Sequence, residues 1–244
     1  MRTPGRILLR AAPALLAAVL ALDIALMLRS PSLWMLPAVL AGWYAADLMS
    51  GVVHMYMDYR PCPPLPGLNA MFFYEGARDS EEYIALRDET FASLGPFERL
   101  VYDFKNHHPR PDALGRRSLR ITTEPTVLFT TLPFALGANM LAGALALAGI
   151  ATPGWAIAGM IAFVLGATFA QYFHGSLHRE DVPWLVRAMR RARLLMRPED
   201  HVAHHDTLTR DFSTINGWSN PPLNLIFRTL RQKGRLRDEG LIPR

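Results

Sequence analysis

Four long apolar runs constrain this chain more than any other feature. They cover residues 8–28, 32–53, 125–150 and 153–173 of a 244-residue sequence, in which 50% of the residues are hydrophobic and only 19% are charged. A bilayer core about 30 Å thick is crossed by roughly 20 apolar helical residues. The last two runs contain no charged residue. We therefore predict an all-α membrane protein with four transmembrane helices.

The first two runs each carry one carboxylate, Asp23 and Asp47, which would be costly if it faced lipid. Because Arg2, Arg6 and Arg10 lie before or at the start of the first run, the rival interpretation of that run is a secretory signal peptide. Its apolar core is longer than the roughly 7–15 residues of such peptides, and no clear small-residue cleavage site follows it. We therefore interpret the first run as a retained helix.

The short connections at residues 29–31 and 151–152 predict two helical hairpins whose tips lie on the same side of the membrane. The N-terminus and the segments 54–124 and 175–244 then lie on the other side. These three regions hold 25 of the 26 lysines and arginines, and only Arg29 lies at a tip. Positive residues favour the cytoplasmic side. We therefore predict cytoplasmic termini and a cytoplasmic, histidine-rich cap over the four helices.

The length of the chain fits a single integral-membrane domain covering residues 1–244. One cysteine, Cys62, excludes both an intramolecular disulfide and a cysteine-rich zinc site. Arginine greatly outnumbers lysine, which is typical of a GC-rich bacterial genome, so we expect a bacterial cytoplasmic membrane. The expected partners are the membrane and its lipids, and not nucleic acid.

The eight histidines all fall in four short groups near the predicted cytoplasmic ends of the spans, so they can converge on one layer. Residues i and i+4 share a helix face, as His174 and His178 do, and as His54 does with Asp58. Adjacent histidines point apart on a helix, which hints at two metal ions. The candidate ligands are His54, His107, His108, His174, His178, His201, His204 and His205.

Imidazole ligands suit iron, zinc and copper. Eight of them exceed what one tetrahedral zinc ion uses, and they suit two iron ions with open positions for dioxygen. The alternative for each single group is an ordinary hydrogen-bonded or exposed histidine. Asp47 precedes His54 by seven residues and Gln171 precedes His174 by three, so we expect both to accept an imidazole N–H. Their alternatives are a bundle-interior carboxylate satisfied by a hydroxyl group, and a plain interhelical hydrogen bond.

Four motifs in order resemble those of the CarF-like lipid desaturases, the family of plasmanylethanolamine desaturase and related phospholipid desaturases. They cover about residues 45–224. Ala46 to Asp58 resembles the family's AD…SG..H…D, Phe104 to Pro111 its F..HH..P, and Gln171 to His178 its Q..H...H. The fourth, H..HH…G.WN..L, is matched by His201 to His205 with Gly217, Trp218, Asn220 and Leu223.

The sequence departs from that family at Met55, where a tryptophan is usual, at residues 59–64, and in a longer stretch over residues 69–100. We expect these segments to shape the entrance for the lipid headgroup. The resemblance implies an oxygen-dependent di-iron enzyme that dehydrogenates a phospholipid alkyl or acyl chain. The vinyl-ether step from plasmanyl to plasmenyl lipid is the first expectation. It also implies that Asp47, Asp58, Gln171 and Asn220 orient the ligands or bind metal themselves.

Removing hydrogen from an unactivated CH₂ group requires oxidising power from a metal and dioxygen. The sequence contains no flavin or dinucleotide glycine motif and no cysteine cluster, so we expect a separate electron donor of the ferredoxin or cytochrome type. Arginines could hold the lipid phosphate at the cytoplasmic interface, which favours reaction close to the headgroup. The candidates are Arg110, Arg116, Arg117 and Arg120.

Three alternatives remain at this point. A di-iron lipid hydroxylase uses the same ligands and adds an oxygen atom to the chain. A membrane metal-binding or transport protein would need ligands along a path through the bilayer, whereas these histidines gather at one face. A bis-histidine haem protein would need histidines paired across the spans at matched depth.

Overall fold

The computed structural model is helical throughout the part it describes, which comprises residues 4–62, 64–77, 80–239 and 241, and these residues form no strand. Four helical stretches are long and apolar enough to cross a membrane: Leu8–Met27, Met35–Tyr59, Leu119–Leu147 and Gly154–Leu177. The predicted all-α membrane fold is therefore confirmed, and the protein is an integral membrane protein.

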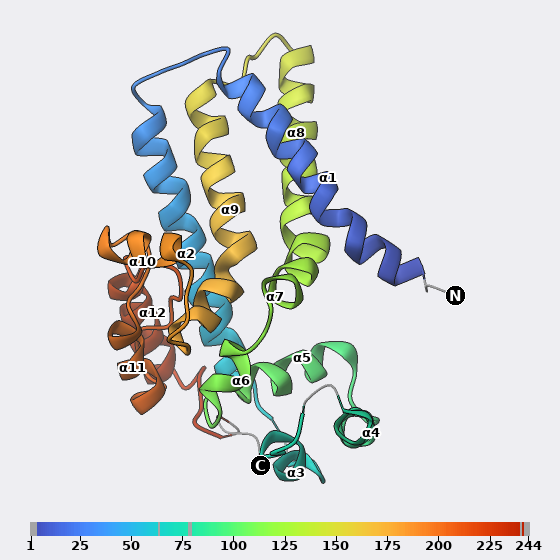
Figure 1. Cartoon of the computed structure of the whole chain (residues 1–244). Coiled ribbons are helices and arrows are strands. Elements are labelled where there is room, and N and C mark those ends of the chain that lie inside the picture. The colour runs from blue at the N-terminus through green and yellow to red at the C-terminus, as the bar shows by residue number, and fades with distance from the viewer. Residues whose placement is uncertain (1–3, 63, 78–79, 240, 242–244) are drawn as a thin grey trace.

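The spans form two hairpins whose tips lie together at one end of the molecule (Figure 1). At this tip end, the backbone N–H of Gly154 donates to Ser30 Oγ at 2.9 Å. The first hairpin joins α1 (Pro4–Met27) to α2 (Met35–Tyr59). The second contains α7 (Leu119–Thr126), the wide turn η1 (Val127–Thr131), α8 (Leu132–Leu147) and α9 (Gly154–Leu177).

The third span begins at Leu119, six residues before the start predicted at residue 125. Pro125 lies inside α7 and does not end the helix. A proline in a helix lacks its N–H group and crowds the preceding turn. The chain continues through the π-helical turn η1, a widened geometry that accommodates such an irregularity.

The second and fourth spans both continue past their predicted ends, through Tyr59 and Leu177. His54, Asp58 and His174 therefore lie within helices rather than beyond them. The apolar runs end earlier because these last turns are covered by protein instead of lipid, and all three side chains are buried. A helix that is covered by a polar layer does not need apolar residues on that face.

Small residues bring α2 and α9 into close contact along their length. A Cβ atom added at Gly42 would lie 2.0 Å from the carbonyl oxygen of Gly159, and one added at Gly166 would lie 2.6 Å from Ala46 Cβ. Such close backbone approach is typical of membrane helices packed through glycine and alanine. Both helices run from the tip end, so their carboxyl ends, with His54 and His174, arrive side by side.

The remaining helices form a cap over this carboxyl end (Figure 1). Its first part contains α3 (Leu68–Phe72), α4 (Glu81–Thr90), α5 (Pro96–Lys105) and α6 (Pro111–Gly115). Its second part contains α10 (Trp184–Arg191), α11 (Pro198–Thr207) and α12 (Asn220–Gln232). The first part has its own apolar core, in which Phe72, Phe91 and Tyr102 are buried. The cap thus closes the end of the bundle at which the histidines gather.

Candidate metal centre

The structure brings all eight histidines together between the bundle and the cap. They divide into two groups, and within each group the candidate ligand atoms all lie within 4.8 Å of one another. The first group consists of His107, His174, His178, His201 and His205, and the second of His54, Asp58, His108 and His204.

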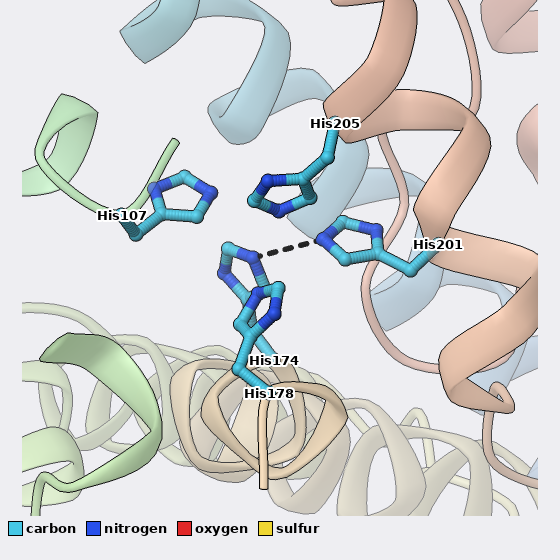
Figure 2. Close-up of side chains that lie close together, drawn as sticks. All are labelled: His107, His174, His178, His201 and His205. Atoms are coloured by element: carbon cyan, nitrogen blue, oxygen red, sulfur yellow. Dashed lines mark hydrogen bonds between the residues drawn. The ribbon is translucent and has the colours of Figure 1, made fainter. Parts of the chain in front are cut away.

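The first group contains imidazoles only, and it is drawn from α9, α11 and the turn after α5 (Figure 2). His174 Nε2 and His201 Nε2 are 3.2 Å apart. The ring centroids of His178 and His205 are 4.7 Å apart, and those of His107 and His174 are 4.6 Å apart. The five rings surround one small space, which is the geometry of a nitrogen-rich metal site.

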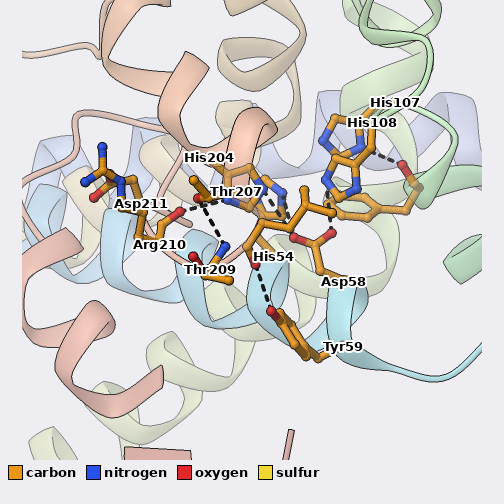
Figure 3. A network of polar contacts seen from close by, with 12 residues as sticks. His54, Asp58, Tyr59, His107, His108, His204, Thr207, Thr209, Arg210 and Asp211 are labelled. Carbon is orange, nitrogen blue, oxygen red and sulfur yellow. Dashed lines mark hydrogen bonds and ion pairs between the residues drawn. The ribbon is translucent and has the colours of Figure 1, made fainter. Parts of the chain in front are cut away.

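The second group surrounds the carboxylate of Asp58 (Figure 3). Asp58 Oδ2 lies 3.3 Å from the Nε2 atoms of both His54 and His204, and Asp58 Oδ1 lies 3.3 Å from His108 Nε2. The carboxylate is fully buried. A buried carboxylate needs compensating positive charge or hydrogen bonds. A metal ion held between Asp58 and the three imidazoles would supply that charge.

Neighbours in sequence are divided between the two groups. His107 belongs to the first group and His108 to the second, and His205 and His204 are divided in the same way. Adjacent residues project in different directions, so each pair can face two spaces at once. The groups themselves are neighbours, since the rings of His54 and His174 are 4.9 Å apart. Two neighbouring clusters of ligand atoms are the arrangement needed to hold two adjacent metal ions.

Unpartnered polar atoms test whether these residues fit a metal. Within the described part of the chain, every one of the eight histidines has a buried ring nitrogen without a hydrogen-bond partner. Both carboxylate oxygens of Asp58 are also buried and without a hydrogen-bond partner. Buried polar atoms are normally satisfied. So many unsatisfied donor atoms converging on two small spaces fit metal ions, which accept nitrogen and oxygen ligands together. We conclude that the residues present fit a two-metal centre.

Backbone carbonyl groups orient two of the imidazoles. His107 Nδ1 lies 2.6 Å from the carbonyl oxygen of Phe104, and His204 Nδ1 lies 2.9 Å from that of Arg210. Each Nδ1–H donates to its carbonyl, which leaves Nε2 free to face the metal space. Neither carbonyl group could be predicted from the residue types, because every residue has a backbone carbonyl group. The position of Phe104, three residues before His107, was the only available signal.

Burial keeps the cap imidazoles neutral. It lowers the pKa of His107, His108 and His201 well below the usual histidine range. It also lowers the pKa of His178 to about 4 and that of His205 to about 3. A histidine must be deprotonated to bind a metal. The site therefore presents these ligands in the required form at neutral pH.

Lys105 is a further buried residue near the site, and no sequence motif indicated it. Its side chain is fully buried, and its Nζ donates to the carbonyl oxygen of Arg60 at 2.7 Å. Burial lowers the pKa of this ammonium group. The contact fastens the last residues of α5 to the end of α2. It therefore fixes the start of the turn that carries His107 and His108 relative to His54.

Asp47 and Asn220 contact the loop before α12 rather than the imidazoles. Asp47 accepts hydrogen bonds from the backbone of residues 215–217 and from Ser219, and Asn220 Oδ1 accepts from the N–H of Ser213. The spacing of Asp47 to His54 predicted instead that Asp47 accepts an imidazole N–H. The difference arises because residues 215–219 fold against α2 and supply both oxygens of Asp47 with hydrogen-bond donors. Gln171 is half-buried one turn before His174, and its role stays a prediction.

The four arginines expected at the lipid phosphate all have partners within the protein. Three form ion pairs: Arg116 with Asp112, Arg117 with Asp103, and Arg120 with Glu124. Arg110 lies over the ring of Phe73, with its Cζ 4.8 Å from the centroid. Arg120 also lines an open surface depression together with Arg10 and Ser118. Their binding of phosphate stays a prediction.

Comparison with known proteins identifies the family. Residues 90–232, more than half of the chain, match the lipid desaturase domain. A plasmanylethanolamine desaturase of Myxococcus xanthus is 25% identical over 214 residues, which cover 86% of this chain and 63% of that protein. The chain thus spans less than two thirds of the length of that relative.

No solved structure matches the chain. The family assignment therefore rests on sequence. The matched region contains seven of the eight histidines, and His54 and Asp58 precede it on α2. These seven histidines supply the whole first group and, with His54 and Asp58 from α2, complete the second. This chain belongs to the lipid desaturase domain family.

Proposed function

We propose that the protein is an oxygen-dependent di-iron desaturase that introduces a double bond into a phospholipid chain close to its headgroup. The observation that carries this proposal is the pair of adjacent ligand groups at one end of an apolar bundle, in a chain of the lipid desaturase family. The similarity to a plasmanylethanolamine desaturase supports an ether lipid as substrate, with the vinyl ether of a plasmenyl lipid as product.

Iron bound by the two groups would supply, with dioxygen, the oxidising power that no side chain has. Two hydrogen atoms leave adjacent carbons of the lipid, two electrons and two protons enter from outside, and dioxygen is reduced to two molecules of water. The eight histidines and Asp58 are the proposed ligands, so the protein contributes their positions and a space closed to bulk water. Phe104 and Phe212 line this space, with ring centroids 5.1 Å and 6.3 Å from that of His54.

The position of the centre favours reaction near the headgroup. The ligand groups lie where α2 and α9 leave the apolar bundle and meet the cap. A lipid with its tail along the bundle and its phosphate at the arginine-rich end would place its first carbons, rather than its distal carbons, beside the metals. Reacting atoms must approach to about 3–3.5 Å. We therefore propose that the first two carbons of an ether-linked alkyl group, or the acyl carbons next to the carboxyl group, are oxidised.

The orientation and the electron supply are part of the same proposal. The excess of arginine at the histidine end supports a cytoplasmic cap and cytoplasmic termini in a bacterial membrane. A separate ferredoxin or cytochrome-type protein would deliver the electrons on this face.

Expression in a host that lacks the activity tests the function. Mass spectrometry of the host lipids should show loss of two hydrogens near the headgroup end, dependent on dioxygen. His174→Ala should abolish this product, whereas Ile226→Ala, which removes an exposed side chain on α12, should retain it. Gain of an oxygen atom would indicate a hydroxylase. Double bonds confined to the distal chain, or an unchanged lipid profile, would contradict the proposal.

A further inference from the structure

A buried carboxylate on α2 holds the loop that precedes α12. Asp47 Oδ1 accepts hydrogen bonds from the backbone N–H groups of Ile215, Asn216 and Gly217 at 3.2, 2.8 and 3.2 Å. Its Oδ2 accepts from Ser219 N at 3.0 Å and from Ser219 Oγ at 2.6 Å. The side chain is fully buried. Five donors to one carboxylate offset the cost of burying its charge within a membrane-spanning helix.

The loop is shaped around this carboxylate. Three consecutive N–H groups point at one oxygen, which is the arrangement of a backbone anion nest. The turn depends on Gly217, whose φ of +83° lies in the left-handed region that favours glycine. The loop also lies close to the backbone of α2, since a Cβ added at Gly51 would lie 3.0 Å from the N–H nitrogen of Ser213.

The start of the same loop reaches the metal-binding residues. The carbonyl group of Arg210 accepts the Nδ1–H of His204 at 2.9 Å. The ring of Phe212 packs against the rings of His204 and His54, with centroids 5.0 and 6.3 Å apart. Both histidines belong to the second group, the one that contains Asp58. The loop therefore connects Asp47 to that group through one hydrogen bond and one aromatic contact.

The first group has its own supports. His174 lies on α9 and His178 directly follows it as the C-cap residue, and His201 Nε2 lies 3.2 Å from His174 Nε2. His107 is oriented by the carbonyl group of Phe104. None of these contacts passes through residues 210–219, whereas the backbone N–H of Met196, two residues before α11, donates to the carbonyl oxygen of Ile215 in that loop at 2.7 Å. Loosening the loop should therefore affect the two groups unequally.

We propose that Asp47 is a positioning residue for the second metal position, acting through residues 210–219 on His204 and His54. This inference rests on the proposed two-metal centre. Asp47 does not touch the metal space. It sets the place of the Arg210 carbonyl group and of the Phe212 ring, and these in turn orient His204 toward Asp58. Loss of the carboxylate should weaken metal binding at the second group and leave the first group intact.

The test compares Asp47→Asn with the wild-type protein in detergent, using cobalt(II) as the probe and both metal content and visible absorption as readouts. Asparagine keeps the size and shape of the Asp47 side chain. Its NH₂ group, however, is a donor and cannot accept the hydrogen bonds from Ser219. The matched control is Thr168→Val, which removes the buried hydrogen bond to Thr131 elsewhere in the bundle. We expect two cobalt ions in the wild type and the control. In Asp47→Asn, binding of one ion should weaken about tenfold or more, as for other groups that support ligands.

Double variants identify the group at which binding of the ion is weakened. Adding His178→Ala to Asp47→Asn should weaken the remaining ion, whereas adding His108→Ala should not. If Asp47→Asn does not fold, Ser219→Ala, which removes one of the five donors, should show the same selective weakening to a smaller degree. Equal binding of both ions in wild type and variant, or equal loss of both, would overturn the role of Asp47. Failure of the wild type to bind two ions would instead contradict the proposed function.

Discussion

Asp58 lies at the centre of three imidazoles, and this position gives it two tasks. Its oxygens lie 3.3 Å from ring nitrogens of His54, His108 and His204. It can bind a metal itself and supply the only negative charge of the two groups. As a ligand, this carboxylate would also distinguish the second proposed metal position from the first, which offers nitrogen only.

We expect Asp58→Asn to lower metal affinity at the second group by roughly 10- to 100-fold and to suppress the desaturated product. The amide keeps the size of the side chain but removes its charge. Metal analysis and lipid mass spectrometry measure the two effects. The control is Asp112→Asn, which removes an exposed carboxylate paired with Arg116. Equal metal content in wild type and Asp58→Asn would contradict this role.

The lowered histidine pKa values predict how the stability of the metal-free protein depends on pH. The pKa of His178 falls to about 4 and that of His205 to about 3, from a usual value near 6.5. At a pH between the lowered pKa of each histidine and its usual value, the unfolded chain binds more protons than the folded chain. Stability is therefore retained above about pH 6.5 and is lost progressively as the pH falls toward 4. Thermal unfolding of the metal-free protein in detergent should show this loss, and a melting temperature that is constant from pH 7 to pH 4 would contradict it.

At the scale of the elements, the centre depends on the contact between α2 and α9. Each helix bears ligands at its carboxyl end, so their separation sets the distance between His54 and His174. Glycine and alanine at the crossing allow the backbones to approach closely. Any side chain that separates the helices would also separate the ligands.

The paired substitutions Gly42→Ala and Gly137→Ala test this contact. A methyl group at position 42 would meet the carbonyl oxygen of Gly159 at 2.0 Å, whereas at position 137 it would meet nothing within 4 Å. We expect Gly42→Ala to destabilise by about 1–3 kcal/mol and to reduce metal content. Gly137→Ala should be neutral or slightly stabilising, because alanine favours the helix. Thermal unfolding in detergent measures the stability of the two variants, and metal analysis measures their metal content. Equal stability and equal metal content of the two variants would contradict the proposed packing.

At the scale of the whole molecule, the two ends differ in chemistry. The tip end is apolar apart from Asp23, Arg29 and a few neutral polar side chains, whereas the cap end contains the two histidine groups and nearly all the positive charge. Positive residues resist translocation across the membrane, so we expect the charge distribution around the two histidine groups to orient the protein as well.

Single-cysteine labelling tests the orientation. After Cys62→Ser, a cysteine placed at Arg237 in the cap end should be protected from a membrane-impermeant thiol reagent in intact cells. A cysteine placed at Ile150 in the tip should react. Permeabilised cells, in which both should react, provide the control. The reverse labelling pattern would contradict the cytoplasmic cap.

The sequence by itself determined the local and compositional features. Apolar runs of sufficient length specify membrane helices whatever lies around them, and the short connections at residues 29–31 and 151–152 predict the two confirmed hairpins. Helical spacing placed His174 beside His178 and His54 beside Asp58. The family motifs predicted the family to which the chain belongs.

Tertiary structure alone decided which residues from different elements meet. The division of the ligands depends on how α11 and the turn after α5 dock on the ends of α2 and α9, and no local period encodes that docking. Asp47 is a second example. Its seven-residue spacing to His54 indicated a shared helix face, but it did not predict that residues 215–219 would bind the Asp47 carboxylate. Spacing within a helix follows from backbone geometry, whereas contacts between residues 47 and 219 follow from packing of the whole chain.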